Sequence, residues 1–149
     1  MKTQSGFTLI ELMMALVVVA ILTAIALPSY NKYIIRSKVP DATSNLATKR
    51  VQMEQWFQDN RTYAADANGN TPPACNNDTT TSKNFDFSCT NQTATTFTLQ
   101  AVGKGAMAGF TYTIDQNNAK TSAFASPAPS GWVAATPNNC WVTNVGGVC

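Results

Sequence analysis

The chain has 149 residues, of which only 12% are charged, and its formal net charge is +2 at pH 7. Such a weak charge gives little support for strong electrostatic binding to nucleic acid, and the absence of histidine removes the commonest general base and metal ligand. Since the sequence also lacks a Walker-type phosphate loop and a nucleophile elbow, we expect no enzymatic activity, no cofactor and no bound metal.

An apolar run extends from Phe7 to Leu27, and only Thr8, Glu11 and Thr23 interrupt it. At about 1.5 Å of rise per residue, a helix of this length crosses a hydrocarbon core about 30 Å thick, so we predict a single membrane-spanning helix. Glu11 stands out because burying a charge in a membrane is costly, and such a residue indicates a function that involves a cationic partner. The partner that we expect is the amino terminus of another copy of the chain.

Cleavage after Gly6 would create that amine on Phe7, close to Glu11 in the sequence. The short polar leader with Lys2, then Gly6, then FTLIE at 7–11 and an apolar helix, resembles the class III signal peptide of type IV pilins and of type II secretion pseudopilins. The resemblance implies cleavage between Gly6 and Phe7 and N-methylation of Phe7 by a prepilin peptidase. It also implies that Glu11 pairs with the amine of a neighbouring subunit in a helical filament.

Two other interpretations of this N-terminal region stay open. An ordinary secretory signal would be cut after small residues, and Ala24 and Ala26 could form such a site, although Glu11 would then have no role. A plain membrane anchor that never assembles is the second alternative. We favour a leader peptide at 1–6, a transmembrane and filament-core helix at 7–28, and a periplasmic or extracellular head at 29–149.

Beyond Pro28, which we expect to bend or loosen the membrane helix, an amphipathic helix should continue to about Asp59. Apolar side chains recur at spacings of three, four and seven, which predicts one stripe that packs on a sheet. The stripe consists of Val39, Ala42, Leu46, Met53 and Phe57, helped by Ala47, Val51 and Trp56. We interpret Trp56 and Phe57 as core rather than as a ligand platform. Because Pro40 disfavours helical geometry at Val39, we predict a second kink at Ser37–Pro40.

Basic side chains accumulate on this stem, while the rest of the head is close to neutral. They are Lys32, Arg36, Lys38, Lys49 and Arg50. We interpret them as a solvated face that also contacts lipid headgroups, and the alternative is contact with acidic groups of neighbouring subunits or with DNA. After Thr62, three lysines stand against four aspartates.

The rest of the chain changes to a period of two, which indicates strands. We predict strands at 85–87, 97–102 and 110–115, the start of another at 120–122, and a last strand at 139–142. A loop should precede the first strand, and we expect Trp132 to anchor the loop at 125–131. The fold class is therefore α+β. A long N-terminal helix, apolar and membrane-spanning in its first half and amphipathic in its second, would pack on a sheet of three or four antiparallel strands, as in the type IV pilin fold.

Four cysteines follow the apolar run. An even number in an exported chain indicates disulfides, and the sequence alone allows three connectivities. We prefer Cys75–Cys89 and Cys140–Cys149 because each pair brackets a polar loop. Zinc binding is the less favoured alternative, since the sequence has neither a Cys-x-x-Cys pair nor a histidine.

With the resemblance, these features indicate a structural subunit of a type IV pilus, most like a minor pilin because the last two cysteines bracket a short loop. The resemblance implies a single-pass inner-membrane protein with a cytoplasmic N-terminus, which an assembly platform adds to an extracellular filament of pilin subunits for adhesion, motility or DNA uptake. The alternatives are a major pilin, a DNA-receptor pilin for natural transformation, for which the sequence gives only weak support, and a pseudopilin of a type II secretion system.

Overall fold

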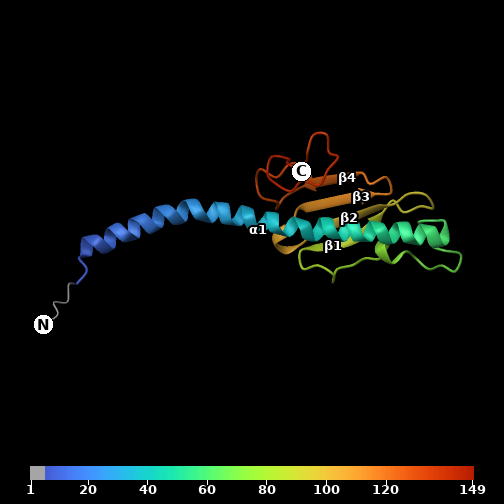
Figure 1. The fold of residues 1–149 in the computed structure, drawn as a ribbon, viewed down its shortest axis with the longest axis horizontal. Helices are drawn as coiled ribbons and strands as arrows, with labels where there is room; N and C mark the ends of the chain where they lie inside the picture. The colour runs from blue at the N-terminus through green and yellow to red at the C-terminus, as the bar shows by residue number, and fades with distance from the viewer. Residues whose placement is uncertain (1–5) are drawn as a thin grey trace. The chain divides into compact units, whose positions relative to one another are not determined.

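The computed structural model describes residues 6–149, apart from the side chains at 27–29, so the predictions for Lys2, for the rest of the leader at 1–5 and for the Pro28 ring lie outside the described residues. Within these residues the elements are, in chain order, helix α1 (Leu9–Asn60), 3-10 helix η1 (Pro73–Cys75), β1 (Phe85–Thr90), β2 (Thr98–Gly103), 3-10 helix η2 (Gly105–Met107), β3 (Phe110–Asp115) and β4 (Lys120–Phe124). Figure 1 shows their order along the chain.

The chain forms two compact units, Met1–Ile34 and Ile35–Cys149. In the first unit, the large apolar side chains between Leu9 and Ile25 of α1 are exposed, from 54% for Val18 to 76% for Leu9, and Phe7 just before the helix is 85% exposed. The mean hydropathy of the most apolar stretch of α1 is 2.7, so α1 is long and apolar enough to cross a membrane. An apolar surface of this extent is unfavourable in water, so it needs lipid or other apolar helices around it.

α1 is an unbroken α-helix through Pro28 and Pro40, so the expectation that Val39 leaves helical geometry is wrong. Val39 is only 1% exposed, and its packing in the core offsets the steric preference of a residue before proline. The Ser44 hydroxyl also donates a hydrogen bond to the Pro40 carbonyl at 2.5 Å. The kinks at both prolines stay predictions.

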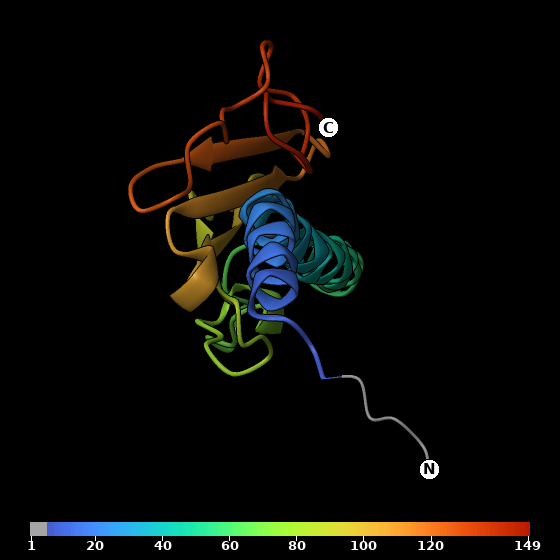
Figure 2. The same ribbon diagram turned by 90° about the vertical axis from the view of Figure 1, so that its left-hand side faces the viewer.

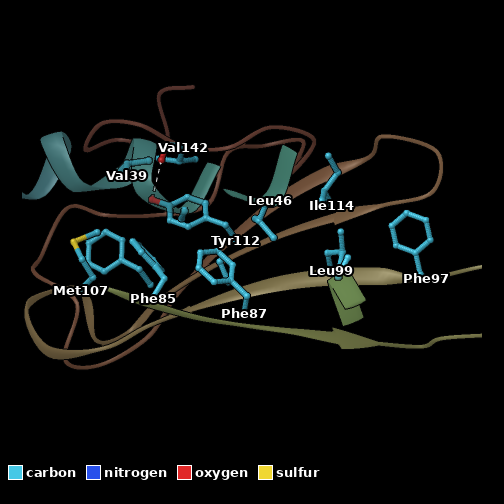
Figure 3. Packing of buried hydrophobic residues seen from close by; sticks show 14 of the residues in the cluster. Val39, Leu46, Phe85, Phe87, Phe97, Leu99, Met107, Tyr112, Ile114 and Val142 are labelled. Atoms are coloured by element: carbon cyan, nitrogen blue, oxygen red, sulfur yellow. Dashed lines mark hydrogen bonds between the residues drawn. The ribbon is translucent and has the colours of Figure 1, made fainter. Parts of the chain in front are cut away.

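In the second unit, α1 runs alongside one face of a sheet in the order β1-β2-β3-β4, with every neighbouring pair antiparallel (Figures 1 and 2). The predicted α+β fold is therefore confirmed. The helix buries one stripe, which consists of Val39, Ala42, Leu46 and Met53. The strands bury their alternate residues against it, including Phe85, Phe87, Leu99, Ala101, Phe110, Tyr112 and Ile114 (Figure 3). Each large side chain buried in this way contributes roughly 1.5–3 kcal/mol of hydrophobic free energy.

Three members of the predicted stripe do not belong to the buried core. Val51 is 63% exposed, and Ala47 is also exposed. Trp56 is half-buried and lies outside the core cluster, whereas its neighbour Phe57 packs against the cluster, as predicted. Successive helical residues are about 100° apart, so a sheet that receives Phe57 leaves Trp56 at the margin of the contact.

The predicted strand at 139–142 is wrong, because this segment attaches to β4 through side chains. The Ser122 amide donates to Asn138 Oδ1 at 3.0 Å, and Asn138 Nδ2 donates to the Ser122 carbonyl at 3.0 Å. The Ser122 hydroxyl accepts the Val142 amide at 2.9 Å. Asn138 thus satisfies the backbone N–H and C=O of Ser122 at the edge of β4, as the peptide group of another strand would. Tyr112 completes the attachment by donating its hydroxyl to the Val142 carbonyl (Figure 3).

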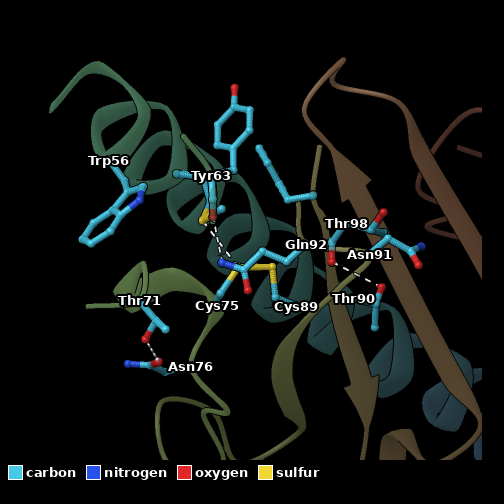
Figure 4. Close-up of a disulfide and its surroundings, with 12 residues drawn as sticks. Trp56, Tyr63, Thr71, Cys75, Asn76, Cys89, Thr90, Asn91, Gln92 and Thr98 are labelled. Carbon is cyan, nitrogen blue, oxygen red and sulfur yellow. Dashed lines mark hydrogen bonds between the residues drawn. A yellow bond between two sulfur atoms is a disulfide. The ribbon is translucent and has the colours of Figure 1, made fainter. Parts of the chain in front are cut away.

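Both cysteine pairs preferred from the sequence are disulfides in the structure. Cys75–Cys89 joins η1 to β1 (Figure 4), and Cys140–Cys149 ties down the last residue of the chain. A crosslink that closes a loop of about 15 residues stabilises a fold by about 3 kcal/mol in the chain-entropy model. Trp132 is 6% exposed and packs against Phe110 and Phe124, as expected of an anchor.

Polar side chains fix the loop before β1 on α1. Asp41 accepts hydrogen bonds from the Ser82 hydroxyl and from the Asn84 side-chain amide. Further along α1, Lys49 Nζ lies 2.9 Å from Asp78 Oδ2, and both side chains are largely buried. The hydrogen bond from Lys49 and those from the loop amides hold the pKa of Asp78 well below its ordinary value.

We predict that Asp78→Asn weakens the acid sensitivity of the fold. A carboxylate whose pKa is lowered by folding stabilises the protein above its unfolded pKa of about 3.9, and the contribution is lost as the pH falls below that value. In urea unfolding, the variant should lose about 1–2 kcal/mol at pH 7 and should show a smaller further loss between about pH 5 and pH 2 than the wild type. Asp59→Asn, which changes an exposed carboxylate, is the control. If the free energy of unfolding fell by the same amount between these pH values in the wild type and in Asp78→Asn, the stabilising role of the Asp78 carboxylate would be contradicted.

Candidate assembly site and head surface

Glu11 is in the first turn of α1, where a neighbouring hydroxyl holds it. Thr8 Oγ1 accepts the Glu11 backbone N–H at 3.3 Å and donates to Glu11 Oε2 at 3.4 Å. Thr8 thus caps the helix by satisfying a free amide of its end, which is the threonine half of a capping box. The sequence analysis gave Thr8 no role, although Thr-x-x-Glu ahead of an apolar run is the pattern that predicts such a cap.

The Glu11 carboxylate is well placed for a cationic partner. It is exposed and lies in the first turn of α1, at the positive end of the helix dipole. Among the described residues, Thr8 alone makes a hydrogen bond to it, and that bond is long at 3.4 Å. The carboxylate oxygens therefore keep most of their capacity to accept hydrogen bonds from an ammonium group of another molecule.

The two residues of the predicted cleavage site precede the helix and are accessible. Gly6 is exposed, and no atom lies within 4 Å of the position that a Cβ would take there. Phe7 is 85% exposed. The structure thus presents Gly6, Phe7 and Glu11 together at one end of α1, and Thr8 and Glu11 are the pair in direct contact.

Several basic side chains of the head form ion pairs or hydrogen bonds with other residues of the head. The expectation that Lys49 and Arg50 belong to a solvated basic face of the stem is therefore wrong. Lys49 pairs with Asp78. Arg50 donates to the carbonyls of Asp115 and Gln116 at 3.4 and 3.2 Å and also pairs with Glu54. Other cations are similarly engaged, namely Lys104 with Asp86 at 2.6 Å and Lys120 over the Trp141 ring at 4.7 Å. Within the described residues, the side chains of Arg61 and Lys83 are exposed and unpaired.

The polar loop at 66–70 closes on itself. The Asp66 carboxylate accepts the amides of Asn68 and Asn70 and the side chain of Asn70, each at 2.8 Å. These hydrogen bonds, above all the one from the Asn70 side chain, lower the pKa of Asp66. Across the part of the chain that the structure describes, no group of three or more His, Cys, Asp or Glu residues is arranged to hold a metal ion. The polar groups of this loop therefore stabilise the turn that the loop itself forms.

Comparison with protein families gives two matches. The family described as type IV minor pilin ComP, DNA uptake sequence receptor, matches residues 28–113. The prokaryotic N-terminal methylation motif matches residues 1–27. The second match covers Gly6, Phe7 and Glu11, and the first covers most of α1 in the head together with β1, β2 and most of β3.

Individual fimbrial proteins are also similar to this chain. Fimbrial protein EcpC of Eikenella corrodens is 37% identical over 65 residues, which are 44% of this chain and 42% of that protein. Type IV major fimbrial protein FimA of Dichelobacter nodosus is 42% identical over 65 residues, which are 44% of this chain and 41% of that protein. The matched segments thus span less than half the length of these relatives.

A solved structure shows the same fold. It is the crystal structure of the non-core minor pilin PilV of Neisseria meningitidis, with a TM-score of 0.52 and 15% sequence identity, and the match covers 68% of this chain and 99% of PilV. Since the family match extends over more than half of the chain, the chain belongs to the type IV minor pilins, a family of structural subunits of pili.

Proposed function

We propose that this chain is a non-enzymatic structural subunit that passes from the inner membrane into an extracellular pilus, with other pilin subunits as its partners. The observation that carries the proposal is the exposed Glu11 carboxylate, held by Thr8 at the start of an apolar helix whose side chains are exposed. Before assembly, lipid would cover that surface, with the N-terminus in the cytoplasm. In the filament, the apolar helices of other subunits would cover it.

Processing would supply the cationic partner for Glu11. A prepilin peptidase would cut between Gly6 and Phe7, at the accessible position described above, and methylate the new amine, which keeps its charge. An assembly platform would then move the subunit into the filament. There, a carboxylate among apolar helices is strongly disfavoured unless it is paired, so a salt bridge from Glu11 to the Phe7 amine of a neighbour would favour one axial register.

We predict that Glu11→Gln blocks entry into filaments without preventing cleavage, insertion or folding of the head. The amide keeps the shape and the hydrogen bond to Thr8 but cannot pair with an ammonium ion. The ratio of subunit in sheared filaments to subunit in the membrane should fall by at least about tenfold. Glu11→Asp, whose reach is shorter, should be intermediate, and Asp59→Asn on the exposed head should behave as wild type. Normal incorporation of Glu11→Gln subunits would exclude the charge-pairing mechanism.

DNA reception is a second candidate function, and the family match over residues 28–113 favours it. Lys49, Arg50, Lys104 and Lys120 already have partners, whereas Arg61 and Lys83 are exposed and, within the described residues, unpaired and so are able to contact phosphate. Both lie in the matched region. The near-neutral head argues against tight non-specific binding, because phosphate contacts provide most of that affinity.

If the chain receives DNA in this way, each of Arg61→Ala and Lys83→Ala should weaken duplex binding and reduce its salt dependence. Each lost phosphate contact reduces the slope of log affinity against log salt by about 0.9. Fluorescence anisotropy with the full chain in detergent micelles would measure this. Lys104→Ala, which removes a charge that is already paired with Asp86, is the control. Equal slopes for the wild type and all three variants would count against these two residues as the phosphate contacts.

A further inference from the structure

A pocket of about 260 Å³ lies on the head, between the last turns of α1 and η1. Four of its residues come from α1, and Pro73 of η1 forms the opposite wall. The residues from α1 are Gln52, Gln55, Trp56 and Asp59. Neither the assembly site at Glu11 nor the unpaired cations of the head contribute to it.

Two sides of the pocket, Trp56 and Pro73, are held in place by contacts outside it. Trp56 Nε1 donates to the Ala64 carbonyl at 3.2 Å, which fixes the orientation of the indole ring. On the other side, η1 ends at Cys75, whose disulfide to Cys89 ties it to β1. Figure 4 shows Trp56 projecting from α1 on the side of the loop that carries Cys75 and Thr71. The indole ring and η1, which are fixed beforehand, therefore lose little conformational freedom when a ligand binds.

The polar side chains of the pocket have unused hydrogen-bonding capacity. In the described part of the chain, the side chains of Gln52, Gln55 and Asp59 make no hydrogen bond or ion pair. They are three, four and seven residues apart, so they share one face of the helix with the indole between them. Together they place two amides and one carboxylate around an aromatic ring, and the described part of the fold uses none of these donors and acceptors.

We propose that this pocket binds one neutral pyranose sugar residue. The electron-rich face of Trp56 would contact the polarised C–H groups of the ring. The two amides would donate hydrogen bonds to the hydroxyls and accept hydrogen bonds from them, and the carboxylate would accept hydrogen bonds from them. Asp59 disfavours a phosphate-bearing ligand such as a nucleotide through charge repulsion. The volume is below the roughly 300–1,000 Å³ of pockets for drug-sized ligands, which points to a single ring. The binding is a property of the head, separate from filament assembly.

The test uses the full chain, labelled with fluorotryptophan, in micelles of a detergent that contains no sugar. The chain has three tryptophans, so ¹⁹F NMR can report on each site, and Trp56→Phe assigns the Trp56 signal. Methyl glucoside, methyl galactoside, N-acetylglucosamine and the peptidoglycan disaccharide are the probes. At least one should shift the Trp56 signal alone, with a Kd in the range of about 1–10 mM. The disaccharide distinguishes a cell-wall source from surface glycans, which the methyl hexosides represent.

Two exposed variants keep the test independent of folding. Gln55→Ala and Asp59→Asn should each weaken the titration by about fivefold to tenfold, whereas Gln58→Ala, an exposed glutamine outside the pocket, should leave it unchanged. The proposal is wrong if no probe shifts the Trp56 signal, or if Gln55→Ala and Asp59→Asn titrate as wild type does. A Trp56 shift produced by a dinucleotide but by none of the sugars would also overturn it, in favour of base stacking.

Discussion

A single helix that must satisfy two different surroundings is the constraint on which the rest of this structure depends. From Leu9 to Ile25, α1 exposes apolar side chains around its surface, while from Val39 onward it buries one narrow stripe against the sheet. A helix apolar on all sides requires an apolar surrounding, whereas an amphipathic one requires a partner surface. The head can therefore complete its own core, but the N-terminal half depends on lipid or on other subunits.

The same constraint explains why a charged group in the apolar half of α1 indicates a function. Glu11 is the single acidic residue between Phe7 and Leu27, and it stands where the helix end offers a hydroxyl and unpaired amides. The cap makes the carboxylate tolerable near a membrane surface, where water still reaches it. It does not supply the opposite charge that an apolar filament core would require, so in the proposed assembly Glu11 would distinguish the inserted from the assembled state.

The sequence predicted those parts of the fold that depend on local periodicity. The period of two in Phe110, Tyr112 and Ile114 placed β3, and the helical spacing of Leu46 and Met53 placed the stripe, because burial on one face leaves a regular pattern. Contacts between distant side chains and the backbone leave no such pattern. The sequence pattern consequently predicted a strand at 139–142, whereas this segment is attached to β4 by hydrogen bonds between the Asn138 side chain and the Ser122 backbone. Trp56 was likewise expected in the core. Because it lies about 100° around the helix from its neighbour Phe57, which packs against the core, its ring lines the pocket with Pro73 instead.

The central claim is that this chain enters a filament with Phe7 as its amino terminus and Glu11 as the group that receives it. Intact-mass and N-terminal fragmentation spectra of subunits from sheared native filaments test it most directly. The account predicts a chain that begins at Phe7 and carries one added methyl group, with both disulfides formed. A mature terminus near Leu27, or a chain in the filament that still carries the residues before Phe7, would contradict it.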